Sequence, residues 1–321
     1  MRLRHLYKPT LLLSLITLLS SFVYYSYSKQ TQNQPANLKI IYNVQLNDSC
    51  ANYEVFSMNT DGTEKKNLSK WKGADWAYAT FGNKIYFVSD RDSTSRWWFL
   101  YEMDVNGNNV RRVSNMRLQD SYVSVNSSGK QIIISPYIKE KKWFFILDIK
   151  SGKIMDTIIV PLANIADPCY LPGDSKIVFR GAKEKKGIED LFIMNLDGSG
   201  LKQLTNYPKA DTTAKWYETH SGTPVWNNKQ KLISYFSKQK GNHSIHTVKP
   251  DGTEAKKITD DKMNEGWHAW SPDGKFIVFD GSDLEDKNFD IYIMKFDGTD
   301  IKRLTRDSLI EQAPLFIQYK N

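Results

Sequence analysis

Glycine turns recur along this chain at an almost constant interval, and this period restricts the fold more than any other feature. Consecutive turn glycines lie 45 or 46 residues apart, with one interval of 54, and they are Gly62, Gly107, Gly152, Gly198, Gly252 and Gly298. A lysine that opens an apolar run keeps nearly the same interval, at Lys39, Lys84, Lys130, Lys176, Lys231 and Lys275. A period of about 40–50 residues built from short strands is typical of the blades of a β-propeller.

Residues 267–305 show how one repeat is expected to fold. Pro272-Asp273-Gly274 supplies a tight turn, because proline presets φ and glycine tolerates a positive φ. The apolar run 276–279 predicts a strand buried on both faces, and 291–294 predicts the next strand. An Asp-Gly-Thr hairpin turn then leads into a fourth strand that ends at Thr305. Four short antiparallel strands make one propeller blade.

The two ends of the repeat region complement each other. Segments 40–44, 53–58 and 65–69 supply the second, third and fourth strands of a blade, whereas 314–319 reads as a first strand with nothing after it. Pairing these segments completes a blade and removes the open strand edges of the ring. The sequence therefore predicts an all-β, six-bladed propeller over residues 38–321.

The first 28 residues differ in kind from the rest. Arg2, Arg4 and Lys8 precede an apolar stretch, which is the layout of an export signal. The stretch lacks a small-residue cleavage site, so a signal peptide and an uncleaved anchor through residues 9–27 both remain open. Residues 29–37 are polar and read as a tether. Either interpretation places the propeller outside the cytoplasm, periplasmic or extracellular.

The charge and cysteine content argue against nucleic-acid binding and against a disulfide. Half of the net charge of +8 comes from residues 2–29, and the remaining acidic and basic residues are interspersed, which does not indicate a nucleic-acid footprint. The repeat register places Cys50 in blade 1 and Cys169 in blade 4, on opposite sides of the ring. That separation exceeds the reach of a disulfide, so we expect none.

Two sequence stretches resemble a known family. IYIMKFDGTDIKRLT and WSPDGKFIVFD are similar to the WD40-like repeats of TolB-type propellers, which also occur in the propeller domains of prolyl-oligopeptidase-type peptidases. The resemblance covers residues 38–319 and is weakest in repeats 2 and 3. It implies a role in assembly of the cell envelope through a protein partner, with peptidoglycan-associated lipoproteins as one example.

Strand polarity sorts the loops onto two faces. The short Pro-Asp-Gly and Asp-Gly-Thr turns fall on one face, and every long segment falls on the other, which we call the long-loop face. These segments are 90–96, 137–142, 183–189, 206–223 and 281–289. Variable loops on a rigid frame commonly carry binding sites. The segment 206–223, with Trp216, Tyr217 and His220, is either a lid or docking element, or a cover for a blade edge.

Acidic residues precede several first strands, at Asp75, Asp120, Asp167, Glu265 and Glu311. At the mouth of the channel they could hold a cation or the basic side chains of a partner. Capping of backbone groups at the blade junctions is the favoured interpretation. A second acidic group consists of Asp283, Glu285, Asp286 and Asp290. It lacks the spacing of a calcium loop, so a solvated loop is favoured over bound Ca²⁺.

No catalytic constellation emerges from the sequence. There is no Gly-x-Ser-x-Gly elbow, and only His220 and His268 are expected near the channel mouth, without a third metal ligand. We therefore expect a monomeric, non-catalytic propeller that binds a protein partner and needs no cofactor. The alternatives are a metal-dependent lyase resembling oligogalacturonate lyase, or a carbohydrate-binding propeller. The latter would expose its tryptophans, among them Trp97, Trp98, Trp216 and Trp267.

Overall fold

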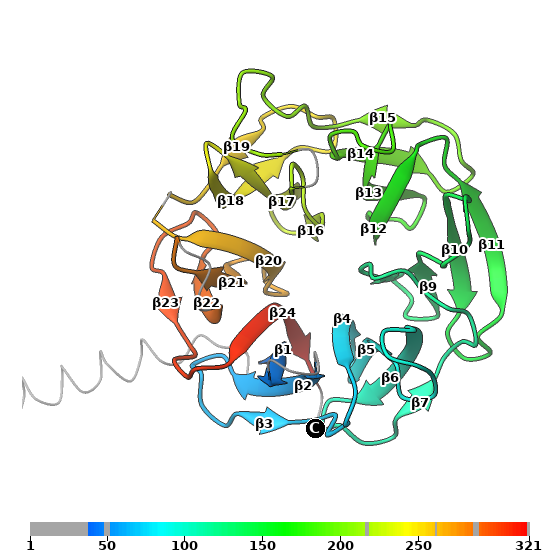
Figure 1. Cartoon of the computed structure of the whole chain (residues 1–321), viewed down its shortest axis with the longest axis vertical. Coiled ribbons are helices and arrows are strands. Elements are labelled where there is room, and N and C mark those ends of the chain that lie inside the picture. Colours follow the sequence, from blue (N-terminus) through cyan, green and yellow to red (C-terminus); the bar gives the residue numbers. More distant parts are fainter. Residues whose placement is uncertain (1–37, 48–51, 216–217, 261, 285–288, 320–321) are drawn as a thin grey trace, which may run out of the picture. The chain divides into compact units, whose positions relative to one another are not determined.

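A computed structural model describes residues 38–47, 52–215, 218–260, 262–284 and 289–319 of the chain. The described residues from Lys39 onward belong to one compact unit, a ring of six blades (Figure 1). Each blade is a four-stranded antiparallel sheet. The predicted fold is confirmed. The expected export segment 1–28 and tether 29–37 lie outside the described residues. Within those residues no helix is long and apolar enough to cross a membrane.

The strands succeed one another blade by blade. Blade 2 contains β4 (Asp75–Phe81), β5 (Lys84–Ser89), β6 (Phe99–Asp104) and β7 (Arg111–Arg112). Blade 3 contains β8 (Ser124–Val125), β9 (Gln131–Ile134), β10 (Trp143–Asp148) and β11 (Ile154–Ile159). Blade 4 contains β12 (Asn164–Tyr170), β13 (Lys176–Ala182), β14 (Asp190–Asn195) and β15 (Lys202–Gln203). Blade 5 contains β16 (Val225–Asn227), β17 (Leu232–Gln239), β18 (Asn242–Val248) and β19 (Lys256–Lys257). Blade 6 contains β20 (Asn264–Trp270), β21 (Phe276–Ser282), β22 (Asp290–Lys295) and β23 (Lys302–Arg303).

Blade 1 joins the two ends of the domain. Its strands are β24 (Ile310–Gln318), β1 (Leu38–Asn47), β2 (Asn52–Asn59) and β3 (Lys66–Asn67), in that order from the axis outward. The expected closure is confirmed, with a longer first strand than the predicted 314–319. Closure gives β1 a partner on each side, so neither of its edges is left open.

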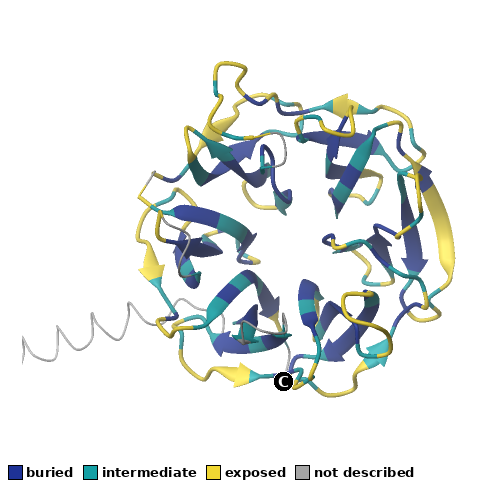
Figure 2. Cartoon of the chain, in the orientation of Figure 1, coloured by how far each residue is buried: buried dark blue, intermediate teal, exposed yellow. Residues whose placement is uncertain are grey.

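The core lies between the blades, and exposure rises toward the rim (Figure 2). Second and third strands are buried on both faces, as in β5 and β14, which explains their unbroken apolar runs. The outermost strands are exposed. Blade 3 departs from the others because its outer strand β11 has six residues, where those of the other blades have two. This strand exposes Ile154, Met155 and Ile159.

The periodic glycines pack against the preceding blade. Gly298 has φ +86°, and a Cβ there would lie 2.0 Å from the carbonyl oxygen of Ile258, at the end of the outer strand of blade 5. The positive φ disfavours any residue other than glycine, and the close contact leaves no room for a Cβ atom. Both constraints therefore require glycine at position 298. Gly62, Gly107 and Gly152 make the same contact, and Gly252 a looser one. Gly198 is the exception, because its nearest atom, Ile159 O, belongs to the long strand β11 and lies 3.9 Å away.

Candidate binding site at the long-loop face

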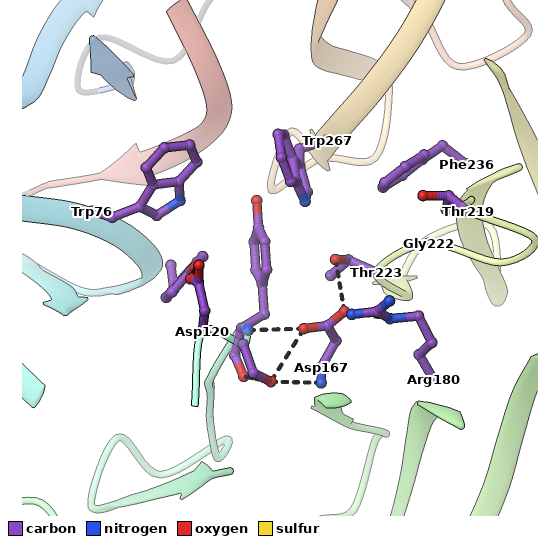
Figure 3. A pocket seen from close by; sticks show the side chains of 12 residues that line it. Trp76, Asp120, Asp167, Arg180, Thr219, Gly222, Thr223, Phe236 and Trp267 are labelled. Atoms are coloured by element: carbon purple, nitrogen blue, oxygen red, sulfur yellow. Dashed lines mark hydrogen bonds and ion pairs between the residues drawn. The ribbon is translucent and has the colours of Figure 1, made fainter. Parts of the chain in front are cut away.

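A cavity of about 200 Å³ lies where the inner strands of five blades converge (Figure 3). Aromatic side chains form much of its wall. Trp76 and Tyr78 come from β4, Tyr122 precedes β8, Phe236 belongs to β17, and Trp267 to β20. The ring centroids of Trp76 and Trp267 are 5.8 Å apart, and those of Tyr78 and Tyr122 are 4.5 Å apart. We call this space the axial cavity.

Asp167 is the main polar group of the axial cavity, and it connects three blades. Its carboxylate accepts hydrogen bonds from the backbone N of Tyr122 at 2.9 Å and from Thr223 Oγ1 at 3.1 Å. Arg180 Nε donates to the same carboxylate at 3.0 Å, and Arg180 also pairs with Glu189 at 2.5 Å. Burial opposes the charged form of Arg180, but Asp167 and Glu189 outweigh it and raise the pKa of the guanidinium. These contacts hold the carboxylate in place and leave it little freedom for proton transfer.

Asp120 is the exposed acidic residue of the axial cavity. Its carboxylate accepts a short hydrogen bond from the hydroxyl of Tyr78. Burial, together with the negative charge of Asp120, raises the pKa of Tyr78 well above its usual value. The phenol therefore stays protonated at physiological pH and acts as a donor.

The remaining predicted acidic residues do not join a single ring. Asp75 is buried and pairs with Arg91 at 2.5 Å, and burial outweighs that pair to raise its pKa to about 6. Glu311 is buried with Lys65 at 4.0 Å, and burial raises its pKa to about 7. Glu265 accepts the backbone N of Ile245 at 3.0 Å across the blade 5–6 junction. Only Asp120 and Asp167 of the five line the axial cavity.

The predicted histidines are buried apart from the axial cavity. His220 packs edge-on against Tyr207, with ring centroids 4.4 Å apart, and burial lowers its pKa. His268 Nε2 lies 2.7 Å from Ser234 Oγ, and burial lowers its pKa to about 4. Among the described residues, no group of three His, Cys, Asp or Glu side chains is placed to hold a metal ion.

Three other expectations fall wholly or partly on residues that the structure does not describe. Trp216 and Tyr217 of the insertion lie outside the described residues, as do Glu285 and Asp286 of the acidic loop. Cys50 also lies outside them, so the expected absence of a disulfide stays a prediction. Burial raises the pKa of the Cys169 thiol to about 11.

An exposed aromatic cluster lies on the long-loop face, and of its members the sequence had indicated only Trp97. The guanidinium of Arg117 lies 4.2 Å from the ring centroid of Trp97 and 4.0 Å from that of Tyr137. Trp97 is 47% exposed and Tyr137 is 55% exposed. Trp97 precedes β6, Tyr137 precedes β10 and Arg117 precedes β8, so three separate loops of blades 2 and 3 build the cluster. We call it the aromatic–arginine cluster.

Comparisons with known proteins support the fold. No family model matches the chain. The curated dipeptidyl-peptidase 5 of Porphyromonas endodontalis is 24% identical over 44% of this chain, and a TolB homolog of Chlorobaculum tepidum is 26% identical over 40% of it. The matched segments span only 20% and 28% of those proteins.

Solved structures extend the likeness to nearly the whole chain. TolB from Acinetobacter baumannii matches with a TM-score of 0.69 and 14% identity, over 93% of this chain and 71% of that one. An oligogalacturonate lyase in complex with manganese matches with a TM-score of 0.51 and 15% identity, over 84% and 74% of the two chains. The resemblance to TolB-type six-bladed propellers is confirmed at the level of the fold.

Proposed function

We propose that this TolB-like propeller is a non-catalytic, extracytoplasmic binding protein that recognises a protein partner of the cell envelope through its long-loop face. The observation that carries the proposal is the aromatic–arginine cluster, which lies on the same face as the long loops. Trp, Tyr and Arg are the residue types that dominate binding energy at protein interfaces. The opposite face consists of short repeated turns.

The axial cavity favours binding over catalysis. Asp167 is occupied by hydrogen bonds from three blades, and Tyr78 is a protonated donor to Asp120. Such groups can orient a bound polypeptide, but neither is arranged as a general base beside a nucleophile. We propose that the chain acts as a monomer, and that the apolar segment at its amino terminus exports it or anchors it to the membrane.

Site-specific photo-crosslinking in intact cells tests this proposal. A photoreactive amino acid replaces Tyr137 on the long-loop face, or Thr253 in a turn of the opposite face. We expect Tyr137 to yield one discrete heavier product, lost when Arg117→Ala and Trp97→Ala are combined in the same chain, and we expect Thr253 to yield none. Equal products from both faces, or none from Tyr137, would contradict the proposal.

The structural similarity to an oligogalacturonate lyase supports the alternative function, that of a metal-dependent lyase. Metal analysis of the purified full-length chain separates the two functions. We expect less than stoichiometric Mn²⁺, Zn²⁺ or Ca²⁺ after dialysis. One tightly bound ion per chain would favour the lyase instead.

A further inference from the structure

A second cavity, of about 280 Å³, adjoins the axial cavity between blades 5, 6 and 1. Thr219, Phe236 and Trp267 line both cavities. Phe289 extends the apolar wall, and Gln312 of β24 contributes a polar group. We call this space the side cavity. Its distinguishing feature is that two buried carboxyl groups, Asp280 and Glu265, line walls that are otherwise largely aromatic.

Asp280 is fully buried on β21 and uses only half of its carboxyl group. Oδ2 accepts the backbone N of Ala313, in β24 of the next blade, at 2.7 Å. Among the residues that the structure describes, Oδ1 meets no donor at full hydrogen-bond geometry, although the backbone N–H of Trp267 lies close enough to favour the ionised carboxyl. A Cβ on Gly266 would lie 2.1 Å from this oxygen, so only a glycine leaves room for it. A buried acceptor without a partner costs free energy unless a ligand supplies the missing donor.

Blade 1 shows that the junction itself does not need a carboxylate. Asn43 occupies the corresponding place in β1, and its amide clamps one residue of the next blade. Its Oδ1 accepts the backbone N of Ala77 at 2.7 Å, and its Nδ2 donates to the backbone O of Ala77 at 3.3 Å. An amide thus satisfies both of its ends, whereas Asp280 satisfies one. The blade junction gives no structural reason for a carboxyl group at position 280.

Glu265 adds a second acidic group to the side cavity. Its Oε2 accepts hydrogen bonds from the backbone N of Ile245 and the hydroxyl of Thr259, while Oε1 has no hydrogen-bond partner within the described part of the chain. Burial raises the pKa of Glu265 to about 7 and that of Asp280 to about 8. Both groups therefore gain or lose protons near neutrality. The other titratable groups nearby are His243 in the cavity wall, Asp260 and Lys257, whose opposite charges act on Glu265, and Tyr122, whose pKa Asp280 helps to raise.

The walls select among cations. The aromatic rings of Phe236, Trp267 and Phe289 suit an alkyl chain or a delocalised cation, because ring faces attract positive charge. The described residues offer no group of three side chains that would hold a metal ion. A hydrogen-bond donor carrying positive charge on an organic stem satisfies Asp280 and fits the aromatic wall.

We propose that the side cavity binds an alkylammonium or guanidinium group, with Asp280 as its counter-ion and Glu265 as a second acceptor. The group belongs either to a lysine or arginine side chain of the protein partner, a reading that rests on the function proposed above, or to a free small amine. Ionisation of Asp280 and Glu265 accompanies binding, so their protons are released to the solvent when the cation enters.

Calorimetric titration of the full-length chain with n-butylamine tests the proposal, with 1-butanol as the neutral probe of the same shape. We expect n-butylamine to bind at pH 9 with little proton release, because both carboxyl groups are already ionised there. At pH 6, where both are protonated, it should bind at least about tenfold more weakly and release protons as it binds. We expect 1-butanol not to bind. Equal binding of the two probes, or no pH dependence, would overturn the proposal.

Three variants locate the site. Asp280→Asn should abolish n-butylamine binding while the chain stays folded, because Asn43 shows that an amide serves the junction. Asp300→Asn removes the same charge from an exposed turn of blade 6 and should leave binding unchanged. Gln312→Lys places a tethered ammonium in the cavity and should also block the probe. Binding that survives both Asp280→Asn and Gln312→Lys would refute the assignment.

The two proposals fail separately. If n-butylamine binds but crosslinking from Tyr137 yields nothing, the amine site stands as a small-molecule site and the partner proposal falls. To identify the source of the cation, an Nα-acetyl-lysine amide is compared with n-butylamine at pH 9. Tighter binding of the lysine probe supports a side chain of a polypeptide, and tighter binding of n-butylamine supports a free amine. If crosslinking succeeds but neither amine binds, the side-cavity proposal falls.

Discussion

At the scale of the residue, the turn glycines show why a Cβ atom is excluded at regular intervals along the chain. Gly298 and Gly198 have nearly equal φ angles, +86° and +85°, so both occupy backbone that side chains rarely adopt. They differ in their surroundings. A Cβ at Gly298 would lie 2.0 Å from a carbonyl oxygen of the preceding blade, whereas a Cβ at Gly198 would lie 3.9 Å from the carbonyl oxygen of Ile159. The strain from φ and the cost of the close contact can therefore be separated.

We expect Gly298→Ala to lower the free energy of unfolding more than Gly198→Ala does. The second change costs about 1 kcal/mol through its positive φ alone, and the first adds the displacement of a neighbouring strand, for about 2–4 kcal/mol in total. Urea denaturation followed by tryptophan fluorescence measures both values. Equal losses would show that the contact between blades contributes nothing.

At the scale of the strand, a hydroxyl side chain closes most outer strands. Ser69, Thr205, Thr259 and Thr305 follow β3, β15, β19 and β23, and each accepts a backbone N of the third strand of its own blade. The distance from Ile291 N to Thr305 Oγ1 is 2.8 Å, and Thr305 is fully buried. Two residues are therefore enough for the outer strand, because the hydroxyl that follows it accepts the next backbone hydrogen bond from the third strand.

We expect Thr305→Val to destabilise the protein by about 1–3 kcal/mol, because the backbone N of Ile291 is left buried without its acceptor. The shape of the side chain is nearly kept, so packing does not account for the loss. Thr157→Val, on the exposed strand β11, is the matched control and should stay within about 0.5 kcal/mol. Thermal unfolding monitored by circular dichroism measures both. A loss at Thr305 no larger than at Thr157 would disprove the role of this hydroxyl.

The sequence predicted the strands well where a local pattern determines them. Second and third strands were evident from apolar runs such as 276–279. The outer strand of blade 3 shows the limit of this reasoning. Its Ser151-Gly152 turn and the run 158–160 indicated an irregular repeat, but the six-residue exposed strand Ile154–Ile159 was not expected. The length of β11 depends on its pairing with β10. The sequence of β11 alone does not reveal that pairing.

At the scale of the molecule, the site was harder to predict than the ring. The sequence placed Asp120 and Asp167 at the mouth of the channel and offered Trp267 as an exposed aromatic residue, and all three line the axial cavity. It missed Arg117, Tyr137 and the half-used carboxyl of Asp280, since each acquires its meaning from a neighbour in another blade. Such contacts join residues far apart in the chain, and no local pattern encodes them. A polar residue ending the apolar strand 276–280 was the only available signal for Asp280.

Closure of the ring should decide whether the whole molecule folds. Deleting residues 310–321 removes β24 and uncovers an edge of β1, so we expect loss of the cooperative thermal transition and self-association through the open edge. Deleting only residues 320–321 leaves β24 intact and should change neither. Calorimetry and size-exclusion chromatography report the two properties. A monomeric, cooperatively unfolding protein without β24 would show that closure is dispensable.

The pairing of β24 with β1 in blade 1 also determines when the ring can close during synthesis of the chain. β1 leaves the ribosome before every other strand of the ring, and β24 leaves it after them all. At ~5–20 residues per second, the earliest strand waits on the order of tens of seconds for its mate. Until β24 is synthesised, the edge of β1 that will pair with it is open and can pair with strands of neighbouring nascent chains. Cells that make this protein therefore gain from a chaperone or translocation pathway that keeps the amino-terminal part sequestered until translation is complete.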